Sequence, residues 1–130
     1  GKLSYTPKHG DPLQYGEALT GVALTPDEWF DRTTDHVFPD APPRLWAAFH
    51  GQTRHTPQVM VTLRDGTCAG IEWFQWFITP RSTHGGLNQV NSAAVLMTTT
   101  RPIEGPLRTR DVMNAIEPGW VPAIVSPAQR

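Results

Sequence analysis

Prolines and glycines interrupt this sequence so often that long elements of regular structure are excluded. The 130 residues include thirteen prolines and eleven glycines. A proline inside a helix removes a backbone donor and clashes with the preceding turn, and a glycine is costly to order. We therefore expect short helices and strands joined by many turns, and not a simple helical bundle.

The chain is long enough for one hydrophobic core and too short for two. Hydrophobic residues make up 38% of the sequence and aromatic residues 9%, which excludes a disordered chain. Proline and glycine punctuate both ends of the sequence. We expect a single α+β domain over residues 25–117, with an extended N-terminal arm over residues 1–24 and an extended C-terminal tail over residues 118–130.

Two short helices are predicted from their start signals. Thr25 suits the N-cap position, Pro26 the first helical position, and Glu28 completes a capping box, so we expect a helix to about Arg32. Thr109 is predicted to cap another short helix that runs through Ile116, which the following proline and glycine end.

A further short helix is predicted after a chain break at residues 39–43. Leu45, Trp46 and Phe49 have helical spacing, and the pattern stops at Gly51, which suits the position after a helix end. We expect the apolar face of this helix to cover the sheet.

The strongest sheet signal covers residues 58–78. The dipeptide Asp65–Gly66 favours a two-residue hairpin turn, because both central residues of such a turn need positive φ. Small and β-branched residues over 90–100 predict a third strand. The expected sheet is small and antiparallel, built on the hairpin at about 58–78 with a third strand at about 90–100.

Large aromatic side chains are predicted on both faces of the second hairpin strand. Phe74 and Trp76 share one face, and Trp73 and Phe77 share the other, because side chains alternate along a strand. One helix layer covers only one face of a sheet. The other face needs the arms, a second sheet or a partner protein.

The charge is nearly balanced overall and unevenly distributed. A formal net charge of −1 argues against a protein whose main task is to neutralise nucleic-acid phosphates. Residues 11–40 carry seven acidic residues and one arginine, whereas residues 41–130 carry eight arginines and five acidic residues. Two interpretations stay open: two solvated faces of opposite sign, or complementary patches that guide association.

The sequence favours a reducing compartment. Cys68 is the only cysteine, so an intrachain disulfide is excluded. No apolar run approaches the roughly eighteen residues needed to cross a bilayer, and we see no apolar core of a signal peptide. We expect a cytoplasmic protein, or a virion protein if the chain is a phage component, with no membrane partner.

No motif indicates catalysis, a cofactor or a metal. The five histidines include no pair with the helical spacing of a zinc-binding HExxH motif, and no nucleotide-binding glycine motif or CxxC occurs. We therefore expect a protein that is not an enzyme and that has no catalytic residue, no cofactor and no metal. A metal site from His50 and His55 with Asp35 or His36 is the weaker alternative.

Two other functions stay open. A single-stranded nucleic-acid-binding or regulatory module would use the aromatic strand for base stacking, with Arg64, Arg81 and Arg101 as a basic rim. A small hydrolase-like enzyme would use His84, but Ser82–Gly86 lacks the rest of a nucleophile elbow.

The favoured hypothesis is a non-catalytic structural subunit that packs against other protein subunits through its arms and aromatic residues. Phage virion components, such as head decoration, connector or tail proteins, are the most natural class. The partners would be protein subunits in a homo-oligomer or larger assembly, with nucleic acid as a less favoured partner. Buried Trp, Tyr and Arg dominate interface energies, so the predicted interaction residues are Tyr5, Tyr15, Trp73, Trp76, Arg101 and Trp120.

Overall fold

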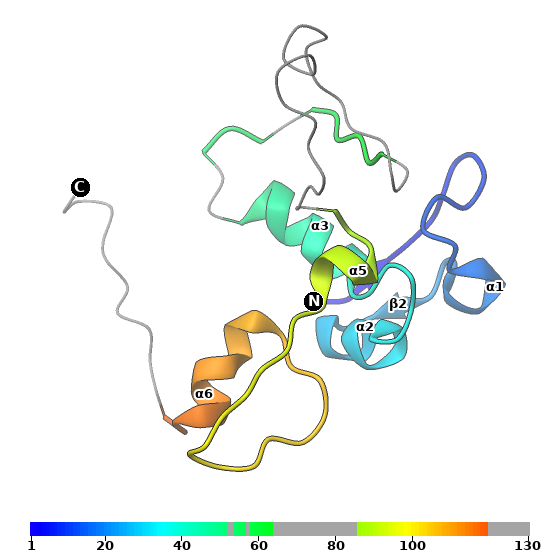
Figure 1. Ribbon diagram of the computed structural model, residues 1–130. Coiled ribbons are helices and arrows are strands. Elements are labelled where there is room, and N and C mark those ends of the chain that lie inside the picture. Colours follow the sequence, from blue (N-terminus) through cyan, green and yellow to red (C-terminus); the bar gives the residue numbers. More distant parts are fainter. Residues whose placement is uncertain (52–53, 57, 64–85, 120–130) are drawn as a thin grey trace, which may run out of the picture. The chain divides into compact units, whose positions relative to one another are not determined.

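A computed structural model describes residues 1–51, 54–56, 58–63 and 86–119, which are broadly α+β (Figure 1). The chain divides into two compact units, the N-terminal unit (residues 1–93) and the C-terminal unit (residues 94–130). The described elements of the N-terminal unit are β1 (Leu3–Ser4), α1 (Gly16–Leu19), β2 (Ala23–Leu24), α2 (Pro26–Thr33), α3 (Ala41–His50) and α5 (Gln89–Ser92). Those of the C-terminal unit are a 3₁₀ turn, η1 (Thr109–Asp111), and α6 (Val112–Ile116).

The two-stranded antiparallel sheet forms at the N-terminus. Leu3 of β1 is opposite Leu24 of β2, and Ser4 is opposite Ala23. The sequence predicts a sheet built on a hairpin at 58–78 instead. Residues 58–63 form no strand, and residues 64–78 lie outside the described part of the chain.

The core of the N-terminal unit consists of Leu13, Tyr15, Leu24, Trp29 and Ala41. Three of these five residues come from residues 1–24, so the predicted extended arm is not confirmed there. Gly10, Gly16 and Gly21 have φ between 62° and 74°. Because glycine adopts positive φ at little cost, these residues form turns that return the segment to the core.

The predicted capping box of α2 is confirmed. The Glu28 backbone N–H donates to Thr25 Oγ1 at 3.2 Å, and the Thr25 N–H donates to the Glu28 carboxylate at 2.7 Å. The helix ends at Thr33, one residue beyond the predicted end. This start fixes the direction of α2 and places the Trp29 side chain in the core, where it is fully buried.

The helix predicted before Gly51 is confirmed as α3, and the predicted break at residues 39–43 is confirmed only for Pro39 and Asp40, which form a turn before the helix. The helix begins at Ala41 and includes both prolines in its first turn. Backbone N–H groups there have no partner inside a helix, so proline loses nothing by lacking one. At the other end, the Gly51 N–H donates to the Ala47 carbonyl at 2.8 Å.

The third strand predicted at about 90–100 is not confirmed in the described residues. Residues 89–92 form α5, and residues 93–98 form no strand. Asn88 caps α5, since its side-chain oxygen accepts from the Asn91 N–H at 3.1 Å. β-Branched residues favour a strand only where neighbours cover them, and Val90 is 85% exposed.

The C-terminal unit contains the predicted last helix with a different start. Residues 109–111 form η1, α6 follows, and the helix ends at Ile116 as expected. Thr109 lies inside the 3₁₀ turn, and no side-chain hydrogen bond caps η1 or α6. No described residue in 94–119 is buried, so this part of the unit has no core of its own.

Candidate interaction groove

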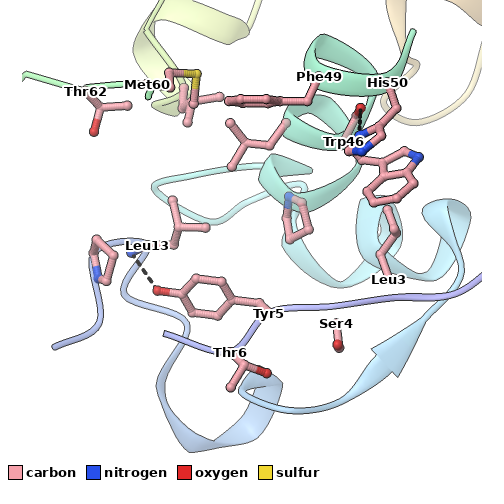
Figure 2. Close-up of a pocket in the computed structure, with 14 residues that line it drawn as sticks. Leu3, Ser4, Tyr5, Thr6, Leu13, Trp46, Phe49, His50, Met60 and Thr62 are labelled. Atoms are coloured by element: carbon pink, nitrogen blue, oxygen red, sulfur yellow. Dashed lines mark hydrogen bonds between the residues drawn. The ribbon is translucent and has the colours of Figure 1, made fainter. Parts of the chain in front are cut away.

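An apolar groove of about 480 Å³ runs along the N-terminal unit. Its walls come from the strand β1 and the residues after it, from α3, and from single residues of later segments (Figure 2). Figure 2 shows Tyr5 and Leu13 along one side of the groove, with Phe49 and Met60 along the other. We call this feature the β1–α3 groove.

Hydrogen bonds hold Tyr5 in place along the groove. Its hydroxyl donates to the Asp11 carboxylate at 2.8 Å and accepts from the Leu13 N–H at 3.3 Å. The other Asp11 oxygen accepts from the Gly16 N–H at 2.7 Å. That backbone donor, with the Tyr5 hydroxyl as a smaller contribution, lowers the pKa of Asp11, whereas burial raises the pKa of Tyr5. The polar atoms here are already paired, which leaves mainly aromatic surface for a ligand.

Trp46 and His50 stand one helical turn apart on α3. Their rings stack with centroids 3.7 Å apart and an interplanar angle of 14°. The Nδ1 atom of His50 lies 3.2 Å from the Trp46 carbonyl oxygen (Figure 2). Trp46 is nevertheless 53% exposed. The stack therefore fixes a large apolar side chain in an exposed position.

Arg44 holds the segment that carries Leu87 beside α3. Its guanidinium donates to the carbonyls of Gly86 and Leu87 at 3.3 and 3.1 Å. It also donates to the Ser92 hydroxyl at 2.8 Å and to the Pro39 carbonyl at 3.3 Å. Five N–H donors in a fixed plane allow one arginine to bind several backbone oxygens. Leu87, a lining residue of the groove, is positioned in this way.

The core behind the groove ties β1 and α3 to one framework. The indole N–H of Trp29 donates to the Leu3 carbonyl at 3.0 Å. The Tyr15 hydroxyl donates to the Phe38 carbonyl at 2.6 Å and accepts from the Ala41 N–H at 3.3 Å. Burial raises the pKa of Tyr15 to about 12. The groove is thus built on side chains that are packed and hydrogen-bonded.

His36 supports the same framework through contacts to backbone groups. Its Nδ1 accepts from the Phe38 N–H at 3.1 Å, and its Nε2 lies 3.1 Å from the Gln14 carbonyl oxygen. Both nitrogens are occupied by backbone groups.

The predicted interaction residues fall in different environments. Tyr5 lines the groove, Tyr15 is only 5% exposed and serves the chain's own core, and Arg101 is exposed. The other predicted residues lie outside the described part of the chain, as does His84; they are Trp73, Trp76 and Trp120.

The groove was not predicted from the sequence, because the apolar face of α3 was expected to cover a sheet. The helix contacts β1, but that strand is too short to cover Trp46. The available signal was the Trp46–His50 pair at i, i+4 spacing, where helix neighbours meet.

The described residues include neither a cluster of metal-binding side chains nor a membrane-spanning helix. Within residues 1–51, 54–56, 58–63 and 86–119, no group of three or more His, Cys, Asp or Glu side chains is placed to hold a metal ion. Among the helices described there, none has both the length and the apolar character needed to cross a membrane.

Comparison with known proteins finds no match: no family model, no curated protein and no solved structure is significantly similar to this chain.

Proposed function

We propose that this chain is a non-catalytic structural subunit that acts by packing against other protein subunits, with the β1–α3 groove as its contact surface. The observation that carries the proposal is Trp46, 53% exposed beside an apolar groove on a hydrogen-bonded framework. Tryptophan is enriched among the residues that dominate interface energies. A fixed, exposed indole beside a concave apolar surface suits such a role.

The balance of buried and exposed apolar residues supports the same proposal. Five hydrophobic residues form the buried core of the described chain, whereas eleven large hydrophobic residues there are at least 40% exposed. Single exposed apolar residues are ordinary, but clustered ones mark interaction sites. Trp46 and Met60 both line the groove, so part of this exposed apolar surface is clustered.

Phage virion components stay the proposed class, as head decoration, connector or tail proteins. The supports are the small size, the proline-rich sequence and the absence of catalytic motifs from the sequence. The location would be the virion, or the cytoplasm before assembly. The nucleic-acid and hydrolase alternatives depend mainly on residues 64–85, which lie outside the described part of the chain.

The test is the native mass by light scattering across a concentration series, for the wild type, Trp46→Asp and Val37→Asp. Val37 is a matched control, because it is 52% exposed and does not line the groove. We expect a wild-type mass above the 14.4 kDa of one chain. A central interface tryptophan contributes about 2 kcal/mol or more, so Trp46→Asp should raise the concentration needed for assembly more than about tenfold.

Val37→Asp should assemble like the wild type. A wild-type mass of 14.4 kDa at every concentration would contradict the proposal. Equal weakening by both substitutions would show that the groove is not the contact surface.

A further inference from the structure

The groove has the chemistry that recognises an extended, proline-containing chain. Tyr5, Trp46 and Phe49 contribute aromatic surface, and Pro42 adds a rigid apolar ring. Extended proline-rich segments bind aromatic-lined grooves because their backbone is already close to the bound conformation, so little entropy is lost. Trp46 also presents an indole N–H donor that makes no hydrogen bond in the described part of the chain.

The sequence itself contains such a segment after α6. Residues 118–129 carry no charged side chain and include Pro118, Pro122 and Pro127. In a polyproline-type conformation, with about three residues per turn, Val121, Ile124 and Pro127 share one edge. At a rise of about 3.1 Å per residue, this apolar edge is about 19 Å long.

The end of the described C-terminal unit marks where this segment begins. Gly119 has φ of 88°, and its N–H donates to the Asn114 side-chain oxygen at 3.1 Å. This bond closes the turn after α6.

We propose that the β1–α3 groove binds the tail, residues 118–130, of a second copy of this chain, which rests on the proposed function. The charges support contact between copies. Residues 1–93 carry nine acidic and seven basic residues, whereas residues 94–130 carry four arginines and three acidic residues. Opposite net signs favour the approach of two copies, whereas the groove lining has no acidic side chain and the contact there is apolar.

Two full-length variants test this contact by complementation. Trp46→Asp alters the groove and keeps the tail, and Ile124→Asp alters the apolar edge of the tail and keeps the groove. At a concentration just sufficient for assembly of the wild type, each variant alone should stay at the mass of one chain, 14.4 kDa, by light scattering. An equimolar mixture should show twice that mass, since one intact groove and one intact tail remain.

Ser126→Asp is the matched control, because it adds the same charge two residues away on a different edge of the extended tail. It should assemble like the wild type. Circular dichroism of each variant checks that the fold is unchanged.

Each of the other outcomes would refute one part of the proposal. Assembly of Ile124→Asp at wild-type concentrations would refute the tail as occupant and leave the groove's role in assembly intact. A mixture that stays at the mass of one chain would refute binding between copies, as expected if the tail binds its own groove or the groove binds a different protein. A monomeric wild type would refute the proposed function as well.

Discussion

Residues 3–41 and residues 94–119 differ in how their hydrogen bonds connect the chain. In residues 3–41, Trp29 bonds to Leu3 across 26 residues and Tyr15 bonds to Phe38 across 23. In residues 94–119, the bond from the Thr100 N–H to the Thr98 hydroxyl and the bond from the Gly119 N–H to the Asn114 side-chain oxygen span two and five residues.

The difference in burial follows the difference in hydrogen bonding. Trp29 has no exposed surface, whereas Val95 and Met97 are 87% and 88% exposed. Long-range polar bonds by aromatic side chains join distant segments around a shared core. Local bonds stabilise a turn or a helix end and leave apolar side chains uncovered. The first region can be stabilised from within, and the second depends on other contacts.

The largest expected effect is the loss of Trp29. Trp29→Ala removes a fully buried side chain and should lower the free energy of unfolding by about 3–5 kcal/mol. Met97→Ala, at a residue that is 88% exposed, should change it by less than about 0.5 kcal/mol. Urea denaturation measures both. Equal losses of unfolding free energy in the two variants would contradict the inference that residues 94–119 have no core of their own.

Tyr15→Phe should have an intermediate effect. The substitution leaves the Ala41 N–H and the Phe38 carbonyl without their partner, which costs about 1–3 kcal/mol for buried groups. Tyr5→Phe is the control, because the Tyr5 hydroxyl is less buried and should matter less. Urea denaturation at neutral pH compares the two variants with the wild type.

The variant Tyr15→Phe also tests the raised pKa of Tyr15. The pKa is about 12 in the folded state against 10.0 ordinarily, so the folded state binds the phenolic proton more tightly. This stabilisation is complete below pH 10 and is lost as the pH rises towards about 12. The difference in unfolding free energy between the wild type and Tyr15→Phe should therefore narrow over that range. A constant difference would contradict the burial of this phenol.

The smallest expected effect compares two threonines near helix starts. Thr25→Ala removes the side-chain acceptor of the α2 cap and should cost about 1 kcal/mol. Thr109→Ala removes no capping bond and should cost less than about 0.5 kcal/mol. Thermal unfolding by circular dichroism distinguishes them. A larger loss for Thr109→Ala would show that the C-terminal unit depends on a contact of this hydroxyl.

The features that were predictable from sequence are local ones. The α2 start needs only residues 25–28, and the α3 end needs only the glycine that follows it. Pro42 and Pro43 led to a wrong predicted start for α3. A proline can end a helix or occupy its first turn, and the surrounding fold decides which of the two occurs. Residues 90–100 were predicted as a strand from their β-branched side chains. Strand formation also depends on neighbouring segments that bury these side chains, and a single sequence does not show those neighbours.

The non-local features were not predictable in the same way. The pairing of Leu3 with Leu24 joins strands of only two residues each, too short to show an alternating pattern. The groove combines β1 with α3 and with Met60 and Leu87, and no local pattern links these segments. Of the candidate site, the sequence indicated Tyr5 but not Trp46.

The bonds of Arg44 have a consequence for how the chain could change in evolution. They join α3 to oxygens of Gly86, Leu87 and Ser92, which are 42, 43 and 48 residues further along the sequence. The two ends of the intervening stretch are therefore fixed close together. Each doubling of a loop's length costs only about 0.6 kcal/mol of closure entropy. An insertion at the exposed residue Arg54 should thus cost little, provided that Arg44 is kept.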